Sequence, residues 1–195
     1  YNTLPQTGVA VCAPVEESDT VTLYAEPDES SDMLFHYYSG TVAEVLEVQR
    51  AWIRVRIGQG EAALEGWMPA RELVYTAKKA RDVAHVVRWY TAEAGEQAVY
   101  AAPDESAKVL RQTLPSGIVE VNGIGTDDWV QLSWYDNEPV TGFTWLGEDA
   151  ELGKPMRAEV YHVDPLDDEL SFEEAEEKAR EYAWQYGKKH GKGWK

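Results

Sequence analysis

Hydrophobic and polar residues alternate along several short stretches of the chain, which predicts a protein built mainly from β-strands. In residues 51–57 (AWIRVRI) aliphatic side chains occupy every second position, so they share one side of an extended strand. Residues 42–48 (VAEVLEV) form another β-rich stretch just before it, and residues 129–134 (WVQLSW) repeat the alternation later. The positions predicted on the outer side of the two tryptophan-led strands are Trp52, Arg54, Arg56, Trp129, Gln131 and Ser133.

One short phrase occurs twice, as YAEPDES at residues 24–30 and as YAAPDES at residues 100–106. Further landmarks follow each phrase in the same order and at nearly the same spacing, which is typical of an internal repeat. The matched landmarks are Ser39-Gly40 with Ser116-Gly117, Trp52 with Trp129, and Gly66-Trp67 with Gly142-Phe143. Short strands separated by Pro, Gly, Asp and Ser favour a small barrel or sandwich. We therefore expect a mainly β fold with two small β-barrels in tandem.

The expected domain organisation follows from the repeat and from the change of pattern at its ends. The predicted parts are a first barrel in residues 1–75, a linker in 76–82, a second barrel in 83–152 and a C-terminal segment in 153–195. In that segment Ser171 and Glu174 match a capping box. An amphipathic helix over about residues 172–186 should follow, and we expect it to pack on a barrel or a partner because short isolated helices are marginal in water.

The charge balance narrows the classes of partner. Asp and Glu number 35 against 18 Lys and Arg, which gives a net charge of −17. Such a field repels phosphate backbones and anionic lipid surfaces, so we expect no nucleic-acid partner. No apolar run reaches the roughly 18 residues of a membrane helix, so we expect no membrane insertion. The chain begins with Tyr1. Removal of a signal peptide, or trimming of the sequence, would explain this start.

No set of residues predicts catalysis, a metal site or a cofactor. Cys12 is the only cysteine and lies in an apolar stretch, where a packed thiol is typical. The four histidines are scattered without the spacing of a zinc site. The acidic run at residues 164–169 lacks the central glycine of a calcium loop, and we interpret it as a solvated run that favours the dipole of the following helix.

Aromatic residues are the remaining candidates for function. The chain has eight Trp and eleven Tyr, and flat rings bury apolar sugar faces or peptide segments at low entropy cost. The candidate ligand-binding residues are Tyr24, Tyr38, Trp52, Trp67, Tyr100, Trp129 and Trp145. Tyr37, Trp134 and Tyr135 could also border a groove. Alternatively, most of these rings wrap a thin core. Alternation places Trp52 and Trp129 on the outer side of their strands, so we expect those two to be partly exposed.

The order of these segments resembles that of the bacterial Src-homology-3-like (SH3b) family. The segments that carry the resemblance are VTLYAEP at 21–27, VLE at 45–47, WIRVRIG at 52–58 and GWM at 66–68. The second copy is a weaker match, with Phe143 where the family usually has Trp. Both copies have tyrosine, Tyr24 and Tyr100, where the family often has arginine.

The resemblance implies a non-enzymatic binding module of an exported bacterial protein at or near the cell wall. Its implied partner is peptidoglycan, or another extended peptide or glycan ligand, held in aromatic grooves. Two alternatives remain open. The barrels could form a protein–protein or structural module, or they could be targeting domains of a cell-wall enzyme whose catalytic part lies outside this chain.

Overall fold

A computed structural model describes most of the two repeated regions. The described residues are 8–15, 19–74, 85–92, 98–113, 117–135, 139–146 and 156–158. The elements of the earlier region are β1 (Gly8–Cys12), β2 (Thr20–Tyr24), β3 (Met33–Tyr38), β4 (Val42–Gln49), β5 (Trp52–Ile57), η1 (Gly60–Ala62), β6 (Leu64–Pro69), η2 (Ala70–Glu72) and β7 (Leu73–Val74). Those of the later region are β8 (His85–Ala92), β9 (Val99–Tyr100), β10 (Val109–Arg111), β11 (Gly117–Ile124), β12 (Trp129–Tyr135), β13 (Pro139–Trp145) and β14 (Met156–Ala158).

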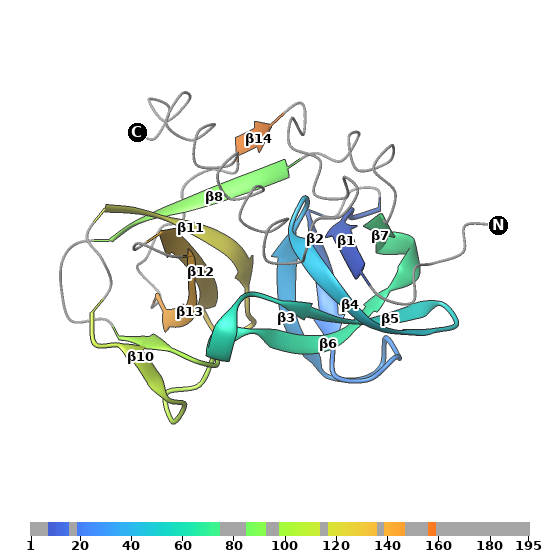
Figure 1. The fold of residues 1–195 in the computed structure, drawn as a ribbon, viewed down its shortest axis with the longest axis horizontal. Coiled ribbons are helices and arrows are strands. Elements are labelled where there is room, and N and C mark those ends of the chain that lie inside the picture. Colours follow the sequence, from blue (N-terminus) through green and yellow to red (C-terminus); the bar gives the residue numbers. More distant parts are fainter. Residues whose placement is uncertain are drawn as a thin grey trace.

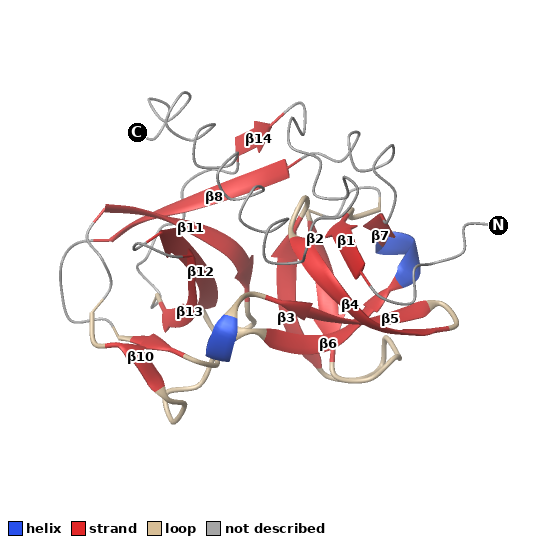
Figure 2. Ribbon diagram, viewed as in Figure 1, coloured by secondary structure: helices blue, strands red, loops and turns tan. Residues whose placement is uncertain are grey.

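We call residues 8–74 the first unit and residues 85–146 the second unit. Their strands follow one hydrogen-bonded path in the order β10-β9-β13-β12-β11-β3-β2-β6-β5-β4-β1-β7, and every pairing along it is antiparallel (Figure 1). β8 pairs with β11 and carries β14 on its other side. Strands dominate the described part of the chain, where the helical elements are the short 3-10 turns η1 and η2 (Figure 2). The mainly β prediction is confirmed.

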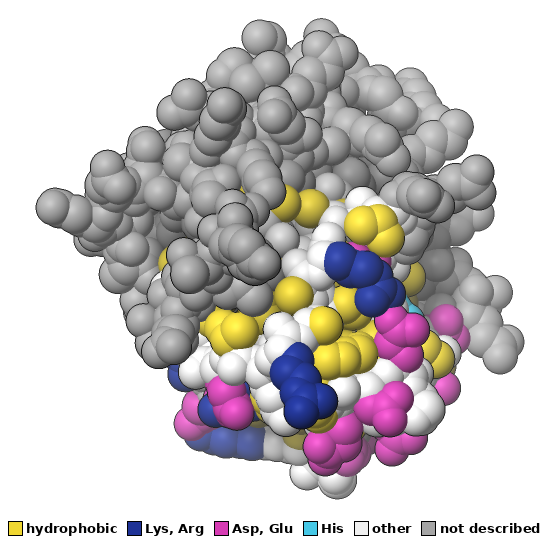
Figure 3. Space-filling view, turned by 90° about the vertical axis from the view of Figure 1, so that its right-hand side faces the viewer, with side chains coloured by type: hydrophobic (Ala, Val, Ile, Leu, Met, Phe, Trp, Pro, Cys, Tyr) yellow, Lys and Arg dark blue, Asp and Glu magenta, His cyan; other side chains and the backbone are white. Residues whose placement is uncertain are grey.

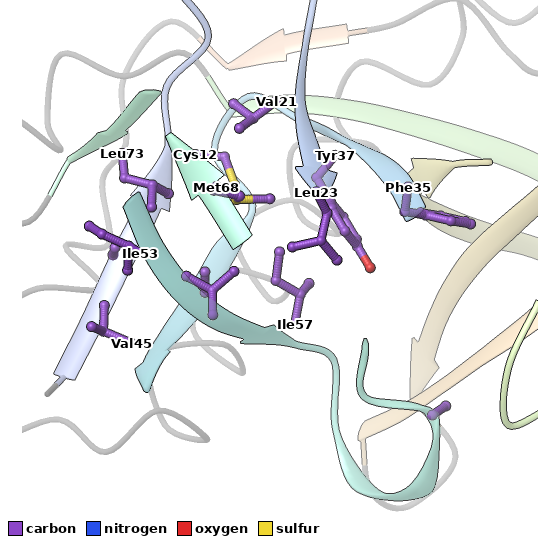
Figure 4. Packing of buried hydrophobic residues seen from close by; sticks show 14 of the residues in the cluster. Cys12, Val21, Leu23, Phe35, Tyr37, Val45, Ile53, Ile57, Met68 and Leu73 are labelled. Atoms are coloured by element: carbon purple, nitrogen blue, oxygen red, sulfur yellow. Dashed lines mark hydrogen bonds between the residues drawn. The ribbon is translucent and has the colours of Figure 1, made fainter. Parts of the chain in front are cut away.

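Alternation in β5 builds the core of the first unit. Ile53, Val55 and Ile57 are buried, whereas the residues between them are half-buried, as the sequence pattern predicts. The buried residues pack with strands on all sides of the unit, as shown by Leu23, Met68 and their neighbours in Figure 4. The turn before β5 begins after Gln49, the last residue of β4, and Arg50 takes a left-handed conformation there at φ 57°.

The second unit repeats an irregularity of the first. The register between β4 and β5 shifts between Val45 and Glu47. The register between β11 and β12 shifts between Val121 and Gly123, which are the corresponding positions of the second unit. A shift of this kind is a β-bulge, which bends a strand and increases its twist.

The two units are joined by a strand pair and by shared packing. β3 of the first unit pairs with β11 of the second, with Tyr37 opposite Gly123. Phe35 of β3 contacts Phe143 of β13 edge-on at 5.4 Å between ring centroids, and both rings belong to the core of the first unit. Tyr38 packs in the opposite direction, into the core of the second unit.

This arrangement qualifies the expectation of two tandem barrels. The sheet passes from one unit to the other through β3 and β11, so the separation into two barrels is not confirmed. The expected linker at 76–82 and the expected helix at about 172–186 lie outside the described residues. Among the described residues, no helix has the length and apolar character needed to cross a membrane.

Candidate ligand-binding site

The repeated YAxPDES phrase folds into the same turn in both units. The Asp28 carboxylate accepts a hydrogen bond from the Ser30 backbone N–H at 2.8 Å, and Asp104 accepts the same bond from Ser106 at 2.8 Å. These backbone hydrogen bonds lower the pKa of both aspartates, because they stabilise the charged form. The turn fixes the loop that follows the tyrosine in each unit.

An aromatic pair, Tyr24 with Trp52, lies beside the first of these turns. The two rings meet edge-on, with their centroids 5.6 Å apart and an interplanar angle of 88°. Both residues are half-buried, so part of each remains accessible. Trp67 lies opposite Tyr24 across the β2–β6 pairing and is buried, at 9% exposure. A Cβ atom at Gly66 would lie only 2.8 Å from the Tyr24 carbonyl oxygen, so this close approach of strands requires glycine.

Ion pairs border this aromatic pair on the outer side of the sheet. Arg54 bonds to Glu47 at 3.2 Å and to Glu65 at 3.3 Å, and it lies opposite Trp67 in the β5–β6 register. Each of these side chains is exposed by a third or more, so the pairs contribute little to stability. The side of the molecule to the right in Figure 1 shows hydrophobic side chains between basic and acidic ones (Figure 3).

The second unit contains a matching pair, Tyr100 with Trp129. Their centroids are also 5.6 Å apart, with an interplanar angle of 75°. Phe143 lies opposite Tyr100 across the β9–β13 pairing, where the first unit has Trp67 opposite Tyr24. The corresponding backbone contacts and ring contacts therefore recur in both units.

The prediction that Trp129 is partly exposed is wrong. Trp129 is 9% exposed and belongs to the same buried cluster as Phe35 of the first unit. Its neighbours on the expected outer side, Gln131 and Ser133, are also buried, at 0% and 2% exposure. The alternation was identified correctly, but β12 is covered on both faces, so its polar side does not reach solvent.

The remaining candidates divide between core and surface. Tyr38 is 3% exposed and lies in the core of the second unit, whereas Trp145 is 46% exposed at the end of β13. Tyr37 is buried in the first core and Trp134 is half-buried, while the side chain of Tyr135 lies outside the described residues. The structure thus brings together Tyr24, Trp52 and Trp67 in one unit, and Tyr100 with Trp129, and Trp145 opposite Trp129, in the other.

Two exposed residues beside the tyrosines were missed by sequence reasoning. Met33 lies opposite Tyr24 and is 52% exposed, and Val109 lies opposite Tyr100 and is 38% exposed. The two YAxPDES loops have equal lengths, so the sequence could have indicated both residues. Each one is the first residue of the strand that follows its loop.

Two potentially reactive groups, the thiol of Cys12 and the imidazole of His36, have structural neighbours in the described part of the chain. Cys12 is fully buried, and burial raises the pKa of its thiol. Its Sγ atom lies 3.9 Å from Sδ of Met68, inside the first core. His36 Nδ1 lies 2.9 Å from the Thr22 hydroxyl, and burial lowers the pKa of the imidazole. No group of three or more His, Cys, Asp or Glu residues that could hold a metal ion occurs within the part of the chain that the structure describes.

Comparison with solved structures gives distant likenesses. NlpC2 from Trichomonas vaginalis is 14% identical with a TM-score of 0.33, covering 78% of this chain and 49% of that one. NlpC1 from the same organism is 13% identical with a TM-score of 0.32, covering 77% and 47%. An NlpC/P60 family protein from Bacillus cereus is 15% identical with a TM-score of 0.31, covering 78% and 57%. The chain spans about half the length of these proteins.

Comparison with families gives a match to one part of the chain. No curated protein matches the chain. Residues 17–74 match the family described as bacterial SH3 domain, and this range holds β2 to β7 and the first aromatic pair. The chain therefore contains one bacterial SH3 domain, at residues 17–74.

Proposed function

We propose that the chain is a non-enzymatic binding module that recognises cell-wall peptidoglycan, or an extended peptide or glycan, through the Tyr24–Trp52 pair. The observation that carries the proposal is the accessible edge-on pair on the outer side of a bacterial SH3 domain. Aromatic rings of this kind cover apolar sugar faces or peptide segments without ordering many rotatable bonds. The domain family and the ring geometry together support a bacterial wall ligand.

The surroundings of the pair suit a ligand that has both apolar and polar groups. Met33 offers further apolar surface beside Tyr24, and Arg54 with its two glutamates offers a polar border. An apolar centre with a polar rim is the usual composition of a binding surface. A sugar or peptide backbone presents groups of both kinds.

The test is retention of the full chain on purified bacterial sacculi, with and without teichoic acid. Trp52→Ala should weaken retention about thirtyfold or more, because loss of a binding aromatic typically costs about 2 kcal/mol or more of binding free energy. Its melting temperature should stay within a few degrees of wild type, because the ring is not in the core. Arg111→Ala, an exposed change in β10, serves as the control and should be retained like wild type.

Two outcomes would contradict the proposal. If wild type is not retained on sacculi of either kind, the wall is not the ligand and the protein–protein or structural alternative becomes the better one. If Trp52→Ala unfolds the protein, the ring is structural. Teichoic-acid dependence would point to that polymer in place of peptidoglycan.

We also propose that residues 85–146 form a second SH3-like unit. The recurring Asp–Ser turn, the second aromatic pair and the β-bulge at the corresponding position support it. With a wall ligand, the protein would act outside the cytoplasm. The two units could also serve as the targeting part of a longer cell-wall enzyme, which the length of the natural gene product would decide.

The proposed module has no hydrolytic activity of its own. The state of Cys12 supports this, because a buried neutral thiol is a poor nucleophile and only the thiolate attacks. A zymogram with the isolated chain should show no clearing of cell wall. Clearing by wild type that Cys12→Ala abolishes would overturn this part of the proposal.

A further inference from the structure

The outer faces of the two units correspond position by position, but the face of the first unit is accessible and the face of the second is buried. We propose that the chain carries a single ligand platform, on the first unit, and that the matching face of the second unit is an internal docking surface that holds the first unit. The ligand half of this proposal rests on the proposed function above. The docking half rests on contacts between the units alone.

The correspondence is set by the strand registers. Arg54 lies opposite Trp67 in the first unit, and Gln131 lies opposite Phe143 in the second. Arg54 is 36% exposed and pairs with two glutamates, whereas Gln131 is 0% exposed. The charged side chain of the first unit is thus replaced by a neutral one at the buried position. Burying an arginine without an acidic partner would destabilise the protein, so a neutral side chain suits a face that another unit covers.

The first unit itself covers the face of the second. The Gln131 Nε2 group donates to the carbonyl oxygens of Ala62 at 3.2 Å and Ile57 at 3.4 Å, which belong to the first unit. The Gln59 backbone N–H donates to the Thr141 hydroxyl at 3.3 Å. The donor groups of Gln131 and Gln59 therefore find acceptors across this contact, whereas the Oε1 atom of Gln131 is buried without a hydrogen-bond partner.

Apolar packing continues the same contact toward the second aromatic pair. Phe143 meets Phe35 of the first unit edge-on, and Trp129 lies in the same cluster. A ligand would have to open this shared cluster to reach the buried face of Trp129. The second pair therefore keeps the geometry of the first, but its tryptophan is buried while Tyr100 remains half-buried.

A glycine makes this fit possible. Gly58 has a φ of +96°, and a Cβ atom there would lie 2.7 Å from Gln131 Nε2 and 2.9 Å from a methyl carbon of Thr141. Both the backbone conformation and the space exclude a side chain. Gly58 and Gln131 are therefore two positions at which a larger or charged side chain would disturb the fit of the units. At the rim of the contact, Lys108 of the second unit pairs with Glu61 of η1 at 2.8 Å.

The docking half is tested by Gln131→Glu in the full chain. The change keeps the shape of the side chain but places a carboxylate against two carbonyl oxygens, in a position with 0% exposure. The melting temperature should fall by about 10 °C at pH 7, and the loss should shrink as the pH approaches 4, where the carboxyl is neutral. Arg54→Gln is the matched control and should shift the melting temperature by about 2 °C or less.

The docking half also predicts the effect of closing the space at Gly58. Gly58→Ala should lower the melting temperature by several degrees, because the methyl group meets Gln131 and Thr141 and because alanine is strained at a φ of +96°. If Gln131→Glu and Gly58→Ala both stay within about 2 °C of wild type, the face is not closed and the proposal is overturned.

The ligand half is tested by titration with soluble muropeptides released from sacculi. We expect one site per chain, loss of binding in Trp52→Ala, and unchanged binding in Trp145→Ala, an exposed tryptophan of the second unit. Two equivalent sites, or loss of binding in Trp145→Ala at an unchanged melting temperature, would overturn the single platform. If the chain binds no muropeptide at all, both the ligand half and the proposed function are contradicted. The melting temperature of Gln131→Glu still decides the docking half.

Discussion

At the scale of single residues, burial decides which chemically distinctive side chains are available. Cys12 and Trp52 illustrate the two outcomes, since one lies in the first core and the other on the outer side of β5. Their sequence surroundings already differ, because Cys12 lies in a continuous apolar run and Trp52 alternates with aliphatic residues. Both assignments could be predicted from local pattern alone. Trp129 could not, because what covers it comes from a distant part of the chain.

The buried thiol leads to a prediction about reactivity and pH. A thiol reagent should modify Cys12 in the native protein only at the rate of unfolding. Because burial raises the pKa above its ordinary 9.0, the folded state holds the proton more tightly than the unfolded state, and stability is lost as the pH rises above about 9. Cys12→Ala should lower stability by about 1 kcal/mol at pH 7. The difference from wild type should narrow above pH 9, which thermal melts at several pH values can measure.

Two results would contradict the prediction for Cys12. Rapid modification of the native thiol would mean that Cys12 is accessible. If the melting temperatures of wild type and Cys12→Ala change in parallel from pH 7 to pH 10, folding does not raise the pKa of the thiol.

At the scale of elements, the YAxPDES turn is the feature that sequence described best. The repeat predicted that two distant segments would have the same conformation, and Asp28 and Asp104 bind Ser30 and Ser106 in the same way. Local hydrogen bonds of a short side chain to its own backbone depend little on what packs around them. The β12 strand shows the limit of such reasoning, because alternation identifies two faces but not which of them another unit covers.

The turns should give the protein a measurable response to acid. The pKa of each turn aspartate is lowered by the backbone N–H bond, so its contribution to stability is present above the ordinary value of 3.8 and is lost as the pH falls below it. Replacing both residues by asparagine keeps an acceptor oxygen but removes the titration. Between pH 6 and pH 2.5 the double variant Asp28→Asn, Asp104→Asn should lose less melting temperature than wild type. Equal losses would show that the turns do not contribute to acid stability.

At the scale of the whole molecule, the two units exchange core residues. Phe143 of the second unit lies in the first core, and Tyr38 of the first lies in the second. The sequence predicts two copies, because local landmarks repeat along it. It could not predict their contact, because the residues that form it, such as Gln131 and Phe143, appear by alternation to be an outer face. Contacts between distant copies are set by shape, which a linear pattern does not contain.

Shared cores predict that both units unfold together. Truncating a buried Phe typically costs about 3–5 kcal/mol, so Phe143→Ala should lower the melting temperature by roughly 10 °C. Because Phe143 contacts Phe35 across the junction, the destabilisation should reach the first unit, and calorimetry should still show one transition with equal calorimetric and van't Hoff enthalpies. Trp145→Ala, at the exposed end of the same strand, is the matched control and should change little. Two separate transitions, with the upper one unaffected by Phe143→Ala, would mean that the first unit is stable without the second and that the shared packing does not couple them.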